Sequence, residues 1–258
     1  MTFRLRDRIP ESARILFRNA RWAIRAAARS ARRTLGGFRA DLYAVGDSHA
    51  KFNFEAAPEF RVRHLGAVTM HRIARDGRAA VSLKPLGVLR GDVVVWCLGE
   101  IDVRCHLIKQ RDLQREPVES LADSLARRFL RSVAAIEGEI GGVHTLVLAV
   151  IPQLDRDDNP EYTRVGTFAE RAEARRLLNA ALQKHCREEG FAFFDPYEGF
   201  VNPDDSLKLE LSDYVVHAGP TAAPIVARRV LEARRSWLGA RSGGSDPSAR
   251  LPSPHGSA

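Results

Sequence analysis

From residue 41 onward, short apolar runs alternate with longer segments of helical spacing. Runs of this kind, bounded by polar or glycine-containing turns, are typical of strands buried in a parallel sheet. Five are predicted as strands: residues 42–45, 61–65, 93–98, 145–151 and 191–194. Apolar residues at helical spacing predict helices over residues 118–140, 167–189 and 220–238. This order predicts an α/β domain, a three-layer α/β/α sandwich with helices on both faces of the sheet.

The first 40 residues follow a different pattern. Between residues 12 and 35, arginines recur three or four positions apart with alanine, isoleucine and leucine between them, which predicts a basic amphipathic helix. This arm, residues 1–40, is expected either to be solvated or packed on the domain, or to bind an anionic membrane surface or acidic polymer. Arginine continues throughout the segment, which argues against a secretory signal peptide.

The charge is confined to one part of the chain. The net charge is +8, and residues 1–40 carry eleven arginines against Asp7 and Glu11, so the remainder is close to −1. The domain, residues 41–238, is therefore nearly neutral, and no nucleic-acid partner is expected. Residues 239–258 are rich in glycine, serine and proline and are predicted to form a disordered tail.

The remaining composition excludes several classes of protein. No apolar run approaches the roughly 20 residues that span a bilayer. Cys97, Cys105 and Cys186 are odd in number and form no CxxC pair, so neither a disulfide framework nor a zinc knuckle is indicated. A reducing compartment fits best. We therefore expect a cytoplasmic protein, with peripheral contact at the inner membrane surface if the arm binds there.

Polar or glycine-containing blocks follow the predicted strands, where ligands bind in open parallel sheets. The blocks are Gly46-Asp47-Ser48-His49, Gly66 after the second strand, residues 99–104 after the third, and residues 212–217 before the last helix. In this order they resemble the SGNH, or GDSL-type, hydrolase superfamily over roughly residues 41–238. The GDSHA motif is also similar to the corresponding motif in SGNH domains of bacterial enzymes that acetylate or deacetylate polysaccharides. The resemblance implies a flavodoxin-like sheet of five parallel strands ordered 2-1-3-4-5.

The resemblance also implies catalytic roles. Ser48 would be the nucleophile, His217 the base that takes its proton, and Asp213 the acid that orients the imidazole. The family spacing is D-x-x-H, whereas this chain has D-x-x-x-H. Either Asp213 still reaches the imidazole, or Asp205 or Glu210 serves instead, or His217 acts in a dyad. No cofactor is needed for this chemistry.

The oxyanion hole departs further from the family. Its donors would be the backbone N–H groups of Ser48 and Gly66 and the side chain of a third-block Asn, but that position holds Ile101, which cannot donate a hydrogen bond. Either Arg104 or another donor compensates, or the site binds ligand without efficient turnover. Arg104 could instead hold an anionic group of the substrate.

Other polar residues near the predicted strand ends are candidate substrate contacts. They are Asp47, His49, Glu100, Asp102 and Arg104. Three of these, Glu100, Asp102 and Arg104, are expected to form an internal salt-bridge cluster together with His106. A metal site is the less favoured interpretation, since no HxH or HExxH spacing is present. His71 is expected to be structural or to line the pocket. Residues 152–166 form a candidate lid loop, in which sugar hydroxyls could meet four polar side chains: Asp155, Asn159, Tyr162 and Arg164.

These observations predict ester hydrolysis or acyl transfer, commonly of acetyl groups, on a carbohydrate or related small molecule through an acyl-enzyme. The alternative is a glycan-binding or assembly protein that keeps the pocket and has lost efficient turnover. A third alternative makes the basic arm a membrane or complex anchor with the domain as its cargo.

Overall fold

The computed structural model describes residues 24, 27, 28, 31, 40–155 and 162–242. Residues 24, 27, 28 and 31 are helical and exposed, at positions predicted to be helical. The other residues of the predicted arm up to residue 39, Asn159 in the loop and the tail from residue 243 lie outside the described residues. The predicted contact of the arm with an anionic surface and the cytoplasmic location therefore stay predictions.

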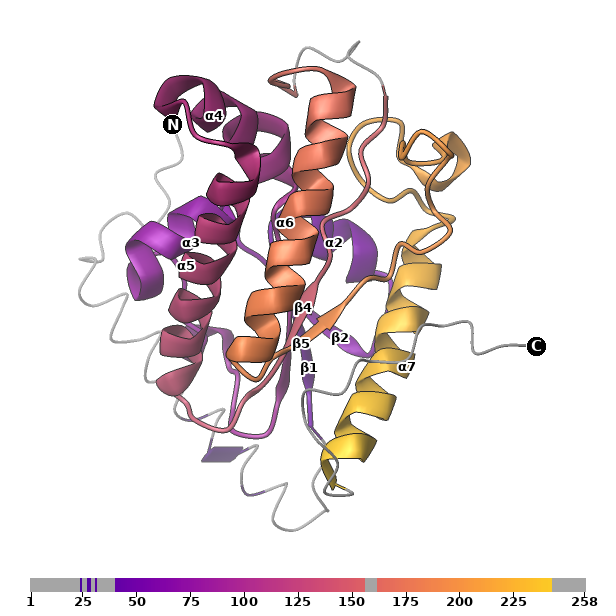
Figure 1. Ribbon diagram of the computed structural model, residues 1–258. Helices are drawn as coiled ribbons and strands as arrows, with labels where there is room; N and C mark the ends of the chain where they lie inside the picture. The colour runs from indigo at the N-terminus through magenta and orange to yellow at the C-terminus, as the bar shows by residue number, and fades with distance from the viewer. Residues whose placement is uncertain (1–23, 25–26, 29–30, 32–39, 156–161, 243–258) are drawn as a thin grey trace, which may run out of the picture.

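Five parallel strands form one sheet in the order β2-β1-β3-β4-β5 (Figure 1). They are β1 (Leu42–Gly46), β2 (Phe60–His64), β3 (Val93–Cys97), β4 (His144–Leu148) and β5 (Ala192–Phe194). The expected fold class and strand order are confirmed. The strand predicted over residues 145–151 ends at Leu148, and its last three residues continue as buried extended chain toward the carboxyl edge of the sheet.

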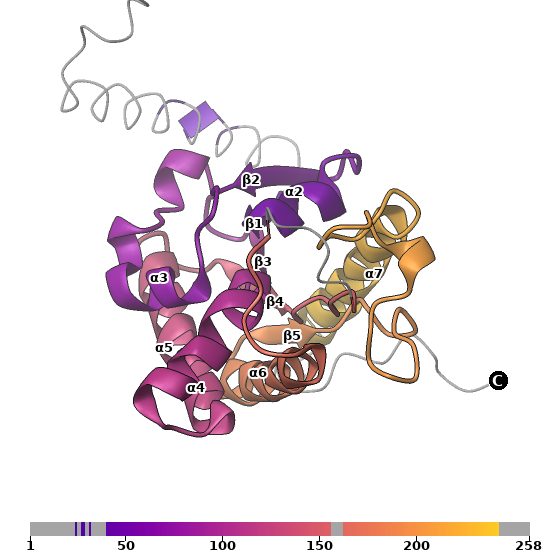
Figure 2. The ribbon, with the colours of Figure 1, turned by 90° about the horizontal axis from the view of Figure 1, so that it is seen from above.

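Helices cover both faces of the sheet, as Figure 2 shows from above. One face carries α3 (Met70–Asp76), α4 (Ile108–Gln114), α5 (Val118–Gly138) and α6 (Phe168–Glu188), and the other carries α2 (Ser48–Phe54) and α7 (Ala223–Ser242). Shorter helical turns are η2 (Gly77–Ala79), η3 (Lys84–Leu86), η4 (Asp102–Leu107) and η5 (Leu209–Leu211). Over the described residues, no helix is long and apolar enough to cross a membrane.

Alternation along the strands divides the core into two layers. In β3, Val94 and Trp96 pack under α5 and α6, whereas Val93 and Val95 pack under α2 and α7. Successive side chains of a strand point to opposite faces, so a strand buried on both faces is apolar throughout. This explains why the apolar runs in the sequence are continuous rather than alternating.

The predicted helix ends differ from the observed ones where the chain carries no strong stop signal. Thr167 begins α6 with a reciprocal capping box to Glu170, close to the predicted start. The last helix runs to Ser242, four residues into the predicted tail. A single glycine such as Gly239 costs a helix only about 1 kcal/mol, so it does not end α7.

Gly46, two residues before Ser48, brings β1 close to β3. A Cβ atom at this position would lie 1.9 Å from the carbonyl oxygen of Cys97. We expect Gly46→Ala to lower the free energy of unfolding by about 3 kcal/mol or more, since the backbone of two paired strands would have to separate. Urea unfolding measures the change. The matched control is Gly138→Ala in α5, where a Cβ meets nothing within 4 Å and alanine favours the helix. Equal midpoints for the two variants would contradict this packing.

Candidate active site

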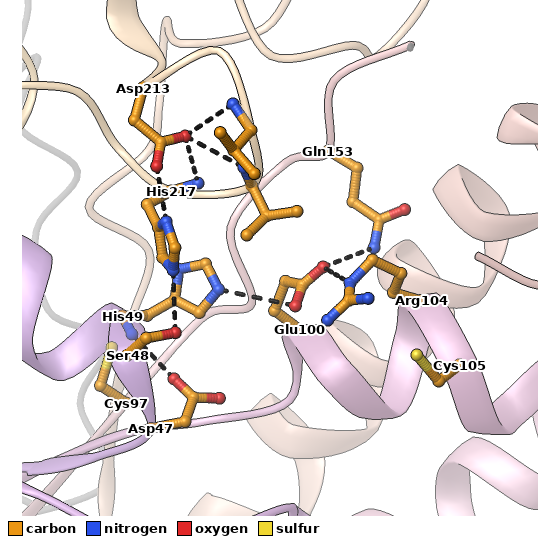
Figure 3. A network of polar contacts seen from close by, with 12 residues as sticks. Asp47, Ser48, His49, Cys97, Glu100, Arg104, Cys105, Gln153, Asp213 and His217 are labelled. Carbon is orange, nitrogen blue, oxygen red and sulfur yellow. Dashed lines mark hydrogen bonds and ion pairs between the residues drawn. The ribbon is translucent and has the colours of Figure 1, made fainter. Parts of the chain in front are cut away.

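The predicted strand-end blocks meet at the carboxyl edge of the sheet. Ser48 begins α2 directly after β1, with Asp47 as the N-cap residue whose carboxylate accepts from the backbone N–H of His49. Ser48 is half-buried. The Ser48 Oγ lies 2.8 Å from Nε2 of His217, although the two residues are 169 positions apart. The serine and the predicted base are therefore in hydrogen-bond contact (Figure 3).

Asp213 reaches the other side of the same imidazole despite its longer spacing. Its Oδ2 lies 2.6 Å from Nδ1 of His217, and its Oδ1 accepts from the backbone N–H groups of Val215, Val216 and His217 at 2.9 to 3.0 Å. Tyr214 adopts a left-handed conformation, with φ of 66°, and this turn accommodates the extra residue. Ser48, His217 and Asp213 thus form a connected row.

The surroundings keep Asp213 ionised and exclude the alternative acids. Burial raises the pKa of Asp213, but the hydrogen bonds from the His217 ring and backbone outweigh it, so the pKa is lowered. Asp205 pairs instead with Arg175 and Arg176, at 2.6 and 3.2 Å. Glu210 is exposed in η5. Asp213 is accordingly the acid that contacts His217.

Two backbone amides, those of Ser48 and Gly66, are the expected oxyanion donors that the chain retains. The backbone N–H of Ser48 belongs to the first turn of α2, where amides lack intrahelical acceptors. Gly66 follows β2 with φ of 75°, a conformation that favours glycine, and its neighbour Leu65 donates to the carbonyl oxygen of Gly46 at the end of β1. The side chain at the third position is the half-buried Ile101, which offers no donor.

Solved structures with this architecture were found by comparison of whole folds. A GDSL-like lipase from Bacteroides thetaiotaomicron superposes with a TM-score of 0.53 at 14% identity, covering 84% of this chain and 97% of that one. The aryl esterase from M. smegmatis gives a TM-score of 0.51 at 14% identity, covering 77% and 99%. The chain has the GDSL-type, or SGNH, hydrolase fold. No family model and no curated protein sequence matches it.

Beside the row of Ser48, His217 and Asp213, this GDSL-type fold buries a second polar network. Nε2 of His49 lies 3.6 Å from Oε2 of Glu100, and Oε1 of Glu100 accepts from Nε of Arg104 at 2.6 Å. Arg104 also donates to the carbonyl oxygen of Thr163 at 2.7 Å, within the predicted lid loop. Figure 3 shows the His49 ring between His217 and Glu100. Arg104 is thus held on two sides and is not aimed at an oxyanion.

The prediction that Asp47 and Asp102 contact substrate needs correction. Both carboxylates are fully buried. Asp102 accepts from the backbone N–H groups of Met70 and His71 at 2.8 and 3.1 Å, so it fixes the start of α3. Burial raises the pKa of Asp102 to about 7, against the lowering effect of those two bonds. Asp47 caps α2 through its Oδ1, and its buried Oδ2 has no hydrogen-bond partner among the described residues.

Several residues that the sequence did not single out complete the site of the GDSL-type fold. Gln153 donates to Glu100 at 3.4 Å and accepts from Arg171 at 3.2 Å, so a buried chain of polar groups leads from α6 to His49. The position of Gln153 just after a predicted strand was the one sequence signal that could have placed it at the site. Arg171 lies within a predicted helix, and nothing in the sequence distinguishes it from the other arginines there. The Phe52 ring stacks on the His217 ring at 4.1 Å and remains 47% exposed.

The remaining candidates fall outside the row of Ser48, His217 and Asp213. His71 is exposed and His106 is half-buried, and the part of the chain that the structure describes contains no group of three His, Cys, Asp or Glu side chains suited to a metal ion. Tyr162 lies near His217, with ring centroids 6.5 Å apart, whereas Asp155 is exposed. Arg164 donates to the carbonyl oxygen of Val215 at 3.3 Å, so the loop is joined to the His217 segment.

Proposed function

We propose that this protein is a serine-dependent esterase or acyltransferase that acts on an acyl ester of a carbohydrate or related small molecule. The observation that carries the proposal is the contact of Ser48 with His217 at 2.8 Å and of His217 with Asp213 at 2.6 Å. A serine hydroxyl attacks an ester only if a base takes its proton, and an imidazole held by a carboxylate is suited to that task.

The reaction follows from this geometry. As Oγ of Ser48 bonds to the ester carbonyl carbon, its proton moves to Nε2 of His217, and Asp213 stabilises the imidazolium. His217 then returns the proton to the leaving alcohol, which gives an acyl-enzyme. Water, or a second hydroxyl compound, then bonds to the acyl carbon and gives its proton to His217. His217 passes that proton to Oγ of Ser48 as the bond between Oγ and the acyl carbon breaks. Hydrolysis and transfer differ only in which acceptor reaches the acyl-enzyme.

The rim of the site supports a ring-shaped acceptor or leaving group. The exposed ring of Phe52 covers one face of His217, and the Tyr162 ring lies edge-on to it. Aromatic faces provide flat apolar contact for the C–H face of a sugar, while the hydroxyl groups stay in water. A cavity of about 330 Å³ lies elsewhere, between the C-terminal end of α2 and α7, and Ser48 does not line it.

Labelling with a fluorophosphonate tests the proposal. We expect the probe to modify Ser48 in the wild-type protein and in Ser236→Ala, a control at an exposed position of α7. Ser48→Ala and His217→Ala are expected to abolish labelling, because one removes the nucleophile and the other its base. Mass spectrometry identifies the modified residue. A folded wild-type protein that takes up no label would favour the second function.

The second function is a glycan-binding or assembly protein that retains the pocket without efficient turnover. Ile101 favours it, since a lost oxyanion donor lowers the rate by a factor of about 10² to 10³. Binding of an acetylated oligosaccharide, with no acetate released and no label on Ser48, would establish this alternative.

A further inference from the structure

His49 is a buried histidine whose two ring nitrogens both lack a hydrogen-bond partner among the described residues. It directly follows Ser48, and its ring centroid lies 4.7 Å from that of His217. Its Nε2 faces Glu100 at an ion-pair distance of 3.6 Å, which is too long for a hydrogen bond, and its Nδ1 also lacks a hydrogen-bond partner among the described residues. The side chain is only 4% exposed, so water cannot freely satisfy either nitrogen. Buried polar groups without a hydrogen-bond partner are uncommon in folded proteins, and a catalytic role is one of the explanations for them.

The charges around His49 favour a proton on both ring nitrogens. The carboxylates of Asp47 and Glu100 flank it, and Arg104 balances only one of them. Burial lowers the pKa of His49, but the fields of Asp47 and Glu100 outweigh it and raise the pKa above its ordinary value. The imidazole therefore holds a donor on Nδ1 where no protein acceptor lies.

The rest of the network keeps Glu100 in place. Its Oε1 accepts from Arg104 at 2.6 Å and from Gln153 at 3.4 Å, and Gln153 is held in turn by Arg171. A carboxylate fixed by several buried partners holds the imidazole beside it in one orientation. Glu100 is thus a positioning residue for His49.

The proposed ester chemistry lacks one component that this arrangement offers. A tetrahedral intermediate needs two or three donors for its oxyanion, and the position that supplies a side-chain donor holds Ile101. The family resemblance assigns two of these donors to the backbone amides of Ser48 and Gly66. To keep the family's three donors, the third has to come from another side chain next to Ser48.

We propose that His49 supplies this donor, with its Nδ1–H hydrogen-bonded to the acyl oxygen of the tetrahedral intermediate and Glu100 holding the Nε2 side. This inference rests on the proposed esterase function. When Oγ of Ser48 bonds to the carbonyl carbon, the π electron pair moves to the acyl oxygen and the hydroxyl proton moves to His217. His49 keeps its own proton throughout, and Asp213, Asp47 and Glu100 offset the charges of the two imidazolium rings.

The test combines loss of the donor with its restoration at the family position. We expect His49→Leu to lower kcat for 4-nitrophenyl acetate by about 10²- to 10³-fold with little change in KM, because the oxyanion forms only in the transition state. Adding Ile101→Asn to His49→Leu is expected to restore kcat at least tenfold, since an amide donor would return to the oxyanion. A packing role for His49 would not be rescued in this way.

A pH profile tests the role of Glu100 separately. His49 is faced by Asp47, Glu100, Arg104 and His217, and Glu100→Gln removes one of the two charges that hold its proton. The alkaline limb of the kcat profile is therefore expected to move to lower pH. If His49→Leu does not fold, this profile decides, and an unmoved limb overturns the proposal.

The possible failures are distinguishable. A wild-type protein without label on Ser48 and without esterase activity overturns the proposed function. An active wild type whose folded His49→Leu variant keeps its kcat, or loses it without rescue by Ile101→Asn, overturns only the role of His49. Thermal unfolding of each variant establishes that the comparison is between folded proteins.

Discussion

Ser48→Ala is expected to lower kcat for hydrolysis of 4-nitrophenyl acetate by about 10⁴- to 10⁶-fold, the loss typical of removing a nucleophile that acts with its base. His217→Ala should lower kcat by a similar factor, since Ser48 cannot lose its proton without that ring. The structure gives the reason, because the two side chains form one hydrogen bond of 2.8 Å.

The double variant gives the sharper result. Residues that act as one unit are not additive, so Ser48→Ala with His217→Ala should be no slower than either single variant. Initial rates at saturating substrate measure this. Independent, multiplying losses would contradict a shared mechanism, and a Ser48→Ala variant within tenfold of wild type would show that another group attacks the ester.

Asp213→Asn is expected to lower kcat by about 10⁴-fold while the domain stays folded. Asparagine retains an oxygen that can accept from the backbone N–H groups of Val215, Val216 and His217, so the loop can keep its shape. It carries no negative charge to stabilise the imidazolium, and its amide would favour the wrong tautomer of His217. The kcat value should therefore fall steeply, whereas the urea midpoint should change little.

Asp205→Asn is the matched control for this prediction. Asp205 has a left-handed conformation, with φ of 72°, which asparagine also tolerates, and its carboxylate pairs with Arg175 and Arg176 rather than with His217. We expect kcat within about threefold of wild type, since surface changes away from the reacting atoms have small effects. A comparable loss of kcat in Asp205→Asn and Asp213→Asn would contradict a specific role of Asp213 toward His217, because any removed negative charge would then have the same effect.

Much of the fold was predictable from periodicity, because the strands are apolar throughout and α5 and α6 carry long amphipathic repeats. The short helices were not predicted. The helices α2, α3 and α4 are each seven residues long, which is too short to display a periodic pattern. The start of α2 coincides with the Gly46-Asp47-Ser48-His49 block, which was recognised as a motif and not as a helix. The strand order came from the resemblance rather than from any local signal.

The site was predictable only where sequence position fixes spatial position. The carboxyl ends of parallel strands meet, so Ser48, Gly66 and the Glu100 block could be located together. The contact of Asp213 with His217 could not be settled, because it depends on the left-handed turn at Tyr214. The roles of Asp102 and Gln153 depend on partners 31 and 53 positions away, which no local pattern encodes.

The loop from Asp213 to His217 has a consequence for how such a site can change over evolutionary time. Its acid and base belong to one five-residue turn, closed by the bridge between Ser212 and Ala218, and only the bond to Ser48 spans the chain. Insertions elsewhere can move this turn as a unit without parting its two members. The turn can therefore hold one more residue, as the D-x-x-x-H spacing of this chain does, while the acid and the base keep their contact.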